Sequence, residues 1–380
     1  MTGRIGLLKV VDSLLARVAV PLVTIFPIKV KRPERPSSIL LIRPGGIGDA
    51  VLLIPAIQAI SKQYPSAQIR VLAERRNASA FQLCPEVHQI LRYDRPSELF
   101  SALRGAYDVV IDTEQWHRLS AVVARLTRAP MLIGFATNER SRLFTNPITY
   151  SHDDYEVDSF IHLIAPLAVE PVQPAERFLV VPADAGQREE ALVASLANRA
   201  FVAIFPGASI PERRWGEDRF RRLAELLAAF DVPVVVVGGE ADKGAGEAIV
   251  ANGKGLNLAG RTSLSETAAV IQKSALLVSG DSGVLHIAVG LGVPTVSLFG
   301  PGRSRKWAPR GERHVVINKA LPCSPCTTYG TTPPCRDDAR CMQEITVDEV
   351  FNAVTILLTA TGTLSSSCCK KGGLEIAGTS

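Results

Sequence analysis

The 380-residue chain lacks several features that mark particular classes of protein. Aromatic residues make up only 6 %, so a stacking surface for single-stranded nucleic acid is not expected. The net charge of +5 is too small by itself to indicate a nucleic-acid partner. Long apolar runs free of charge are also missing, so no membrane-spanning helix is predicted. With 47 % apolar and 21 % charged residues, the chain is expected to form two or three compact domains.

Residues 1–36 form a distinct N-terminal segment. Asp12 and Arg17 interrupt its apolar residues, and no small-residue cleavage site follows, which argues against a signal peptide. The pattern predicts an amphipathic helix on an anionic membrane, with a helix packed on the protein's own core as the alternative. The apolar face consists of Leu7, Leu8, Val11, Leu14, Leu15, Val18 and Leu22. Basic residues placed to reach lipid headgroups are Lys29, Lys31, Arg32 and Arg35.

Between residues 37 and 360, short β-branched runs alternate with helical patterns. This rhythm predicts an α/β fold with parallel, doubly wound sheets. Prolines interrupt it at residues 169–186, so we predict an N-terminal domain at 37–180 and a C-terminal domain at 181–360. Residues 361–380 are rich in Ser, Gly and Thr and are predicted to be a disordered tail. Two such domains would leave a cleft at the carboxyl ends of their strands.

A glycine-rich loop joins the first predicted strand, Ile39–Ile42, to the helix expected at Asp49–Gln63. Gly45, Gly46 and Gly48 permit close approach to the backbone. Asp49 at the helix start is either an ordinary N-cap or a general base that accepts a hydroxyl proton. A dinucleotide-binding loop with Glu74 as the ribose acid is a third interpretation, but the glycine spacing departs from G-x-G-x-x-G.

Three segments of the second half place polar residues after predicted strands. Ser209 and Arg213 follow the strand at Phe205 and suit phosphate oxygens, or they form a solvated basic turn. Glu240 follows Gly238-Gly239 and is either a ribose-binding acid or a helix cap. A helix expected to begin after Asp281 offers amides to an anion. The residues of this third segment are Asp281, Ser282, Gly283 and His286.

Four of the seven cysteines cluster near the C-terminal end. Their spacing, C-x2-C followed by two further cysteines, predicts a structural zinc site within an insertion at 323–341, with free thiols and disulfides as alternatives. The four are Cys323, Cys326, Cys335 and Cys341. No catalytic role is expected for them.

Taken together, these motifs resemble glycosyltransferase family 9, the lipopolysaccharide heptosyltransferases. The matching elements are RPGGIGDAVLLIPAIQAI at 43–60, FPGAS with RRW at 205–215, and SGDSGVLHIAVGLGVPTVSLFGP at 279–301. The resemblance implies a GT-B fold, with two Rossmann-like domains facing across a cleft. It also implies inverting transfer of a heptose from an ADP-activated donor.

The resemblance assigns roles to the residues singled out above. Asp49 matches the family's general base, and Arg213 stands where the family has a phosphate-binding lysine. Glu240 is a looser match for its ribose-binding acid. The element Asp281-Ser282-Gly283-x-x-His286 matches the family's donor-binding element. Arg213, Ser209 and the Gly283 helix terminus could stabilise the departing diphosphate without a metal, so no catalytic cofactor is expected.

The expected partners are an ADP-sugar donor, a glycolipid or glycan acceptor, and an anionic membrane contacted by residues 1–36, with no nucleic acid. The expected location is the cytoplasmic face of a bacterial inner membrane. Two other functions stay open: an NAD-dependent oxidoreductase that uses Gly45–Gly48, and a non-catalytic nucleotide-sugar-binding module at the membrane.

Overall fold

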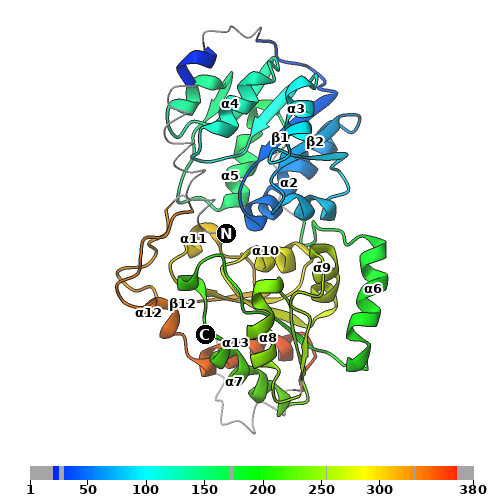
Figure 1. The fold of residues 1–380 in the computed structure, drawn as a ribbon, viewed down its shortest axis with the longest axis vertical. Helices are drawn as coiled ribbons and strands as arrows, with labels where there is room; N and C mark the ends of the chain where they lie inside the picture. Colours follow the sequence, from blue (N-terminus) through cyan, green and yellow to red (C-terminus); the bar gives the residue numbers. More distant parts are fainter. Residues whose placement is uncertain are drawn as a thin grey trace. The chain divides into compact units, whose positions relative to one another are not determined.

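The computed structural model describes residues 20–24, 30–170, 175–197, 199–253, 255–328 and 330–365. The chain divides into two compact units, one ending at Val180 and the other beginning at Val181. Each unit has its own parallel sheet with helices around it (Figure 1) and its own buried apolar core.

The N-terminal unit is built on a six-stranded parallel sheet in the order β3-β2-β1-β4-β5-β6. Its central strand β1 contains Ile39–Ile42, which are at most 1 % exposed. Such an uninterrupted apolar run is typical of a strand covered on both faces. The strands are β1 (Ser38–Arg43), β2 (Gln68–Ala73), β3 (Gln89–Arg92), β4 (Val109–Asp112), β5 (Met131–Phe135) and β6 (Asn146–Ile148).

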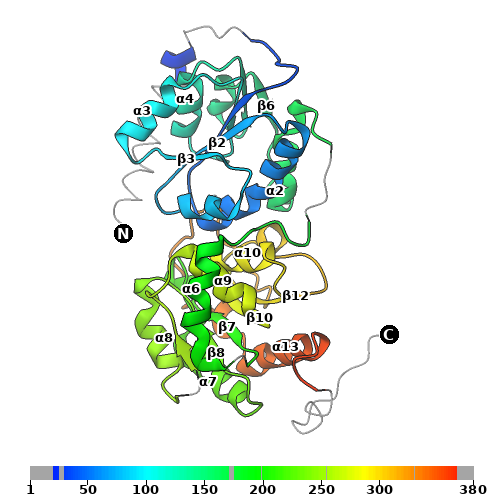
Figure 2. The same ribbon diagram turned by 90° about the vertical axis from the view of Figure 1, so that its right-hand side faces the viewer.

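Helices cover both faces of this sheet (Figure 2). On one face, α2 (Ile47–Gln63) packs against α5 (Glu156–Leu163). On the other, α3 (Pro96–Arg104) and α4 (Leu119–Leu126) share a core with β1, β2 and β4, and Val20 belongs to that core. Short 3-10 helices are η1 (Ala78–Leu83), η2 (Glu139–Leu143) and η3 (Ala165–Leu167).

The C-terminal unit repeats the topology of the first. Its sheet has the order β12-β11-β10-β7-β8-β9, so the first strand, β7, lies between β8 and β10 as β1 lies between β2 and β4. Ligands of open α/β sheets bind at the carboxyl edge where the strand order reverses in this way. The strands are β7 (Val202–Phe205), β8 (Val234–Val236), β9 (Gly255–Asn257), β10 (Leu276–Gly280), β11 (Thr295–Phe299) and β12 (His314–Asn318).

Trp215 is the largest fully buried side chain of the C-terminal core. It is 1 % exposed, its ring lies 4.8 Å from that of Phe220, and its Nε1 donates to the Ile345 carbonyl at 2.8 Å. The α-helices are α6 (Ala183–Val193), α7 (Glu217–Ala228), α8 (Lys243–Ile249), α9 (Leu264–Lys273), α10 (Gly283–Gly290), α11 (Ser304–Trp307), α12 (Arg340–Gln343) and α13 (Val347–Ala360). The 3-10 helices are η4 (Ala194–Leu196), η5 (Pro211–Arg213) and η6 (Glu240–Asp242).

The predicted α/β architecture with doubly wound parallel sheets is confirmed. Three edge strands, β6, β9 and β12, are missing from the strands predicted from the sequence. The first two have three residues each and contain Pro147 and Gly255, which are unfavourable within strands. β12 does contain three consecutive β-branched residues, Val315, Val316 and Ile317, and this strand signal was not used in the prediction.

The two ends of the chain lie partly outside the described residues. The predicted amphipathic helix falls on 1–19, and most of the predicted tail falls on 366–380. Val20 is 3 % exposed and packs on the N-terminal core, which favours the packed alternative for residues 20–24. Leu364 also packs on a core, and its amide donates to the Leu358 carbonyl at 3.1 Å. Ordered structure therefore continues past the predicted start of the tail at residue 361.

A search of the described helices finds none with the length and hydrophobicity needed to cross a membrane.

Candidate functional site

The glycine loop after β1 places the Asp49 carboxylate beside the backbone. Gly45 has φ +108°, a conformation that L side chains rarely adopt. A Cβ at Gly45 or at Gly46 would lie 3.6 Å from Asp49 Oδ2. Asp49 stands in the first turn of α2, whose N-cap is Gly46, and its side chain is 24 % exposed. The carboxylate is thus accessible from outside the unit while its surroundings are largely buried.

Arg43 at the end of β1 is the cation nearest to Asp49 among the described contacts. Its side chain is 1 % exposed, and its Nη2 lies 4.0 Å from Asp49 Oδ2 and 3.2 Å from Glu114 Oε2. Its Nη1 donates to the Thr113 carbonyl at 2.8 Å, and its guanidinium lies 5.9 Å from the centre of the Phe160 ring. Arg43 therefore sits between the segments that follow β1 and β4.

Burial is the largest influence on Asp49 and raises the pKa of its carboxyl group. Arg43 opposes this effect, Glu114 adds to it, and the net pKa lies above the ordinary value for aspartate. Burial would also raise the pKa of Glu114, but Arg43, His117 and Arg140 hold it below the ordinary value. The arrangement gives an ionised Glu114 next to a carboxylate that is a better proton acceptor than a free aspartate.

A chain of hydrogen bonds extends from Arg43 through Gln115 to Glu156 and Tyr150. Gln115 Nε2 donates to Glu156 Oε1 at 2.5 Å, and the Tyr150 hydroxyl donates to Glu156 Oε2 at 3.1 Å. Glu156 is fully buried, and burial raises the pKa of Tyr150. Tyr150 therefore stays a neutral donor, and the buried acid is held by hydrogen bonds.

In the C-terminal unit, Arg213 and Asp281 meet at the reversal of strand order. Arg213 follows β7, Asp281 follows β10, and these strands are paired. Nη1 of Arg213 lies 3.1 Å from Oδ2 of Asp281, and both side chains are largely buried. The structure thus brings together two residues that the sequence singled out separately.

The N-terminus of α10 adjoins this pair. Ser282 is its N-cap, and the hydroxyl accepts a hydrogen bond from the Leu285 amide at 3.2 Å. His286, one turn into the helix, is 3 % exposed, and burial lowers its pKa to about 4, so the imidazole is neutral at pH 7. Ser282 therefore has a structural role, while Gly283 begins the helix and leaves its amides available to an anion.

Three buried nitrogen atoms at this edge lack hydrogen-bond partners within the described part of the chain. They are Nε of Arg213, Nδ1 of His286 and Nε of Arg303. Arg303 follows β11, and a Cβ at the preceding Gly302 would collide with Asp281 Oδ2, so this turn packs against Asp281. Buried polar groups usually have partners, so these three nitrogen atoms are candidates for contacts with a polar ligand.

Glu240 and Asp242 lie in the turn after β8. Asp242 Oδ2 accepts from the Gly239 amide at 2.9 Å, so Asp242 does the capping that the sequence left open for Glu240. Glu240 is exposed, and its carboxylate lies against Gly260, where a Cβ would meet Oε2 at 2.5 Å. Ser209 is exposed in the loop after β7. Both remain available to a ligand at this edge.

Glu74, the acid that a dinucleotide site would need, is engaged elsewhere. Its carboxylate pairs with Arg76 and accepts from the Tyr93 hydroxyl. This engagement is unfavourable for a ribose contact, which argues against the oxidoreductase interpretation.

The cysteine-rich segment packs on the turn after β11. The amides of Cys326 and Thr327 donate to the Pro301 carbonyl at 3.1 and 3.0 Å. Cys323 and Cys335 are exposed, Cys341 is buried, and the cysteines within the described ranges are free thiols rather than disulfides. No group of three or more metal-ligating side chains is found among the residues that the structure covers. The zinc site therefore stays a prediction.

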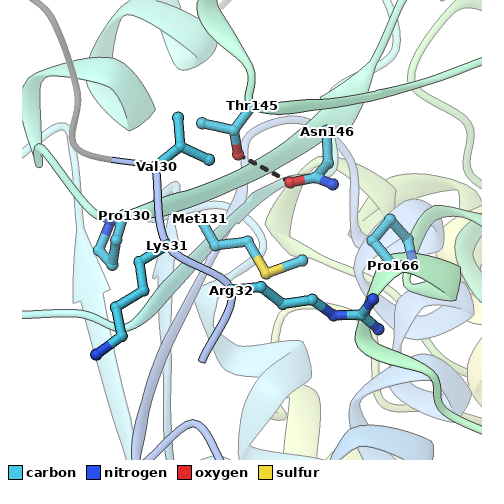
Figure 3. Close-up of a pocket in the computed structure, with 8 residues that line it drawn as sticks. All are labelled: Val30, Lys31, Arg32, Pro130, Met131, Thr145, Asn146 and Pro166. Atoms are coloured by element: carbon cyan, nitrogen blue, oxygen red, sulfur yellow. Dashed lines mark hydrogen bonds between the residues drawn. The ribbon is translucent and has the colours of Figure 1, made fainter. Parts of the chain in front are cut away.

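A pocket of about 180 Å³ in the N-terminal unit contains none of the predicted site residues (Figure 3). Lys31 and Arg32 line it, together with residues of β5 and β6. The Lys31 amide donates to the Pro130 carbonyl at 3.3 Å, which holds this basic segment on the unit.

Three residues near the candidate site were not predicted from the sequence. Arg43 and Glu114 lie beside Asp49 in the N-terminal unit, and Arg303 lies beside Asp281 in the C-terminal unit. Arg43 lies within the matched glycine-loop motif, and its position after four apolar strand residues was the available signal. Glu114 and Arg303 also follow strands, but other charged residues do so without joining a site.

The two parallel doubly wound sheets, one in each unit, place the chain in the class of the GT-B fold. Residues 97–335 match the model of glycosyltransferase family 9 (heptosyltransferase). The chain therefore belongs to this family, and the predicted resemblance is confirmed.

Several similar proteins are named heptosyltransferases. Lipooligosaccharide heptosyltransferase 2 of Haemophilus ducreyi is 27 % identical over 309 residues, which cover 73 % of this chain and 88 % of that protein. The structure of E. coli ADP-heptose LPS heptosyltransferase II superimposes with a TM-score of 0.71 at 23 % identity, over 86 % of this chain and 99 % of the other. E. coli WaaC with ADP-2-deoxy-2-fluoro heptose gives 0.66 at 16 % identity, over 84 % and 99 %. The structural matches show the shared fold.

Proposed function

We propose that this glycosyltransferase is inverting and metal-independent, and that it moves a heptose from ADP-heptose to a lipopolysaccharide-type or other envelope glycan acceptor. Family membership supports glycosyl transfer, and the names of the similar proteins support heptose, ADP and lipopolysaccharide as the chemical classes involved.

The Asp49 carboxylate is the observation that carries the proposal. It is partly exposed in the first turn of α2, beside the glycine loop that follows β1, and its pKa is raised. Asp49 takes the proton from an acceptor hydroxyl, and the hydroxyl oxygen bonds to the anomeric carbon as the bond to the diphosphate breaks. ADP departs with the bonding electrons. One displacement of this kind inverts the anomeric centre.

The polar residues at the sheet edge of the C-terminal unit support binding of the nucleotide-sugar donor. Arg213, Arg303 and the amides at the start of α10 offer positive charge and donors to a diphosphate. His286 is neutral and buried, with Nδ1 free to contact the ligand. We assign Glu240 to the ribose hydroxyls and Ser209 to a phosphate oxygen, and the exposure of both side chains supports this assignment.

Metal independence rests on these same groups. Two arginines and a helix N-terminus can balance the charge that develops on the leaving diphosphate. A structural zinc held by Cys323, Cys326, Cys335 and Cys341 remains a separate proposal. Metal analysis of the purified protein and of its Cys323→Ser variant tests it: about one zinc per chain in the former and loss in the latter are expected.

The acceptor is proposed to bind at the Gly45–Gly48 loop and to be presented at a membrane. Lys31 and Arg32 are exposed, which supports contact of this basic segment with an anionic surface. The proposed location is the cytoplasmic face of the bacterial inner membrane.

A direct assay tests the proposal. Purified protein is incubated with ADP-heptose, other ADP-sugars and GDP-sugars, with and without EDTA, on truncated lipopolysaccharide acceptors. ADP release, acceptor-dependent and unchanged by EDTA, is expected with ADP-heptose, and NMR of the product should show inversion. Preference for another donor would overturn the assignment of ADP-heptose, and a requirement for added metal would overturn metal independence. Reduction of NAD would overturn glycosyl transfer as the reaction.

A further inference from the structure

The buried Arg43 has two acidic neighbours, the candidate base Asp49 and Glu114. Its guanidinium lies 4.0 Å from Asp49 and 3.2 Å from Glu114, and the Glu114 side chain is 8 % exposed. A fully buried arginine needs counter-charge, and Glu114 supplies it at the shorter distance. Arg43 is thus shared between a structural acid and the acid that the proposed mechanism uses.

Backbone contacts fix the guanidinium in place. Nε donates to the Pro44 carbonyl at 2.5 Å, and Nη1 donates to the Thr113 carbonyl at 2.8 Å. Nη2 is the nitrogen left to face the carboxylates, and it also lies 3.4 Å from Gln115 Oε1. Because the strands β1 and β4 are paired in register, these contacts hold the loops that follow them at a fixed separation.

We propose that Arg43 is a positioning residue for Asp49 and that Glu114 shares this arginine, so that the pair sets how strong a base Asp49 is. The inference rests on the proposed role of Asp49 and goes beyond it, since it assigns the tuning of that base to two residues that do not touch the substrate.

The charged and titratable surroundings of Asp49 are few. Arg43 and the more distant Arg76 favour its ionised form, while Glu114 disfavours it. Tyr150 is influenced by Asp49 and by Glu156 but remains neutral. With Arg43 alone Asp49 would have a lower pKa and be a weaker base, and with Glu114 alone it would have a higher pKa and be less ionised. The shared arginine avoids both extremes.

The direction of each effect can be stated. Asp49 works when ionised, so kcat/KM falls as pH falls through its pKa. Replacing Arg43 with Met removes a cation, raises the pKa of Asp49 and moves the acidic limb of the pH profile to higher pH. Replacing Glu114 with Gln removes an anion, lowers that pKa and moves the limb to lower pH. Each shift is expected to be about one pH unit.

The experiment measures kcat/KM against pH for the wild type, Arg43→Met, Arg43→Lys and Glu114→Gln, with ADP affinity as a control for the C-terminal unit. Arg43→Lys should keep the limb closer to that of the wild type because the charge is retained. Arg76→Gln is the matched control: it removes a cation that is half-exposed, and its shift should be smaller than that of Arg43→Met.

Opposite shifts for the Arg43 and Glu114 variants support the inference. Shifts in the same direction, or losses of rate with an unchanged acidic limb of the pH profile, overturn it. Arg43 and Glu114 would then have only a packing role. If Arg43→Met does not fold, the isosteric Glu114→Gln variant and the Arg43→Lys variant still test the inference. An acidic limb that does not move in Glu114→Gln would overturn it. The Asp49→Asn variant distinguishes failure of this inference from failure of the proposed function. If that variant stays active, Asp49 is not the base.

Discussion

In the C-terminal unit, Nη1 of Arg213 lies 3.1 Å from Oδ2 of Asp281. The two residues follow the paired strands β7 and β10, and the pair leaves Nε of Arg213 buried without a partner in the described structure. The ion pair thus holds the arginine at the sheet edge with donor capacity left for a ligand.

Replacing Arg213 with Ala should weaken ADP binding by about 1.5–3 kcal/mol, because a charge-assisted contact to the diphosphate is lost. Adenosine binding should hardly change. Isothermal titration calorimetry with both ligands measures this, and Arg214→Ala, at an exposed neighbouring position, is the control. Equal losses for adenosine and ADP would place Arg213 elsewhere on the ligand.

Replacing Arg303 with Gln should also weaken ADP binding, by roughly 1–2 kcal/mol, if its guanidinium, whose Nε has no partner among the described residues, meets the diphosphate. The same calorimetry checks this, and Arg305→Gln in the same turn is the matched control because Arg305 is exposed. If the two variants bind ADP alike, Arg303 is not part of the nucleotide site.

Replacing Asp49 with Asn should reduce turnover by about 10²–10⁴-fold and leave ADP affinity nearly intact. The carboxamide keeps the size of the side chain but cannot take the acceptor proton at neutral pH. Steady-state kinetics with saturating donor measure the loss. Reduced donor affinity with normal turnover would contradict the assignment.

Removal of residues 1–19 should weaken binding to anionic vesicles while the fold is retained, because most of the predicted apolar face is lost and the basic residues Lys29, Lys31, Arg32 and Arg35 stay. The truncation spares Val20, which packs on the N-terminal core. Basic residues near an anionic surface contribute about 1 kcal/mol each, and salt screens this part, so binding of the full chain should weaken as salt rises. Vesicle co-sedimentation measures both effects. Unchanged binding, or loss of ADP binding on truncation, would place this segment in the core.

Replacing Arg140 with Met should destabilise the N-terminal unit by about 3–5 kcal/mol. Arg140 pairs with Asp112, both are 0 % exposed, and the change would leave the Asp112 charge buried without its partner. Urea unfolding measures the loss. The exposed pair of Arg222 with Glu225 is the control, and Arg222→Gln should cost less than about 1 kcal/mol.

Much of the fold and part of the site could be predicted from the sequence. Strands such as β1 and β10 are recognisable because they are buried on both faces and therefore read as short apolar runs. Asp49, Arg213 and Asp281 stand after such strands, in loops whose glycines and turn residues mark a sheet edge. The sequence could therefore indicate them one by one, but not their distances.

The remaining residues depend on contacts between distant parts of the chain. Glu114 meets Arg43 across 71 residues, and only the pairing of β1 with β4 brings them together. The choice between Glu240 and Asp242 as the cap is local, but the sequence does not decide it either, because both acids stand in one turn and only the hydrogen bond from the Gly239 amide assigns the role to Asp242.

The repeated topology has a consequence for how the chain responds to heat. Each unit closes its own hydrogen-bonded sheet around its own apolar cluster, so the chain need not melt as one cooperative block. A nucleotide that binds only the C-terminal half would protect that half by mass action and leave the other to unfold at its own temperature. A single melting temperature would then describe the weaker half, and ligand screens based on it would overlook nucleotide binding whenever the N-terminal half melts first.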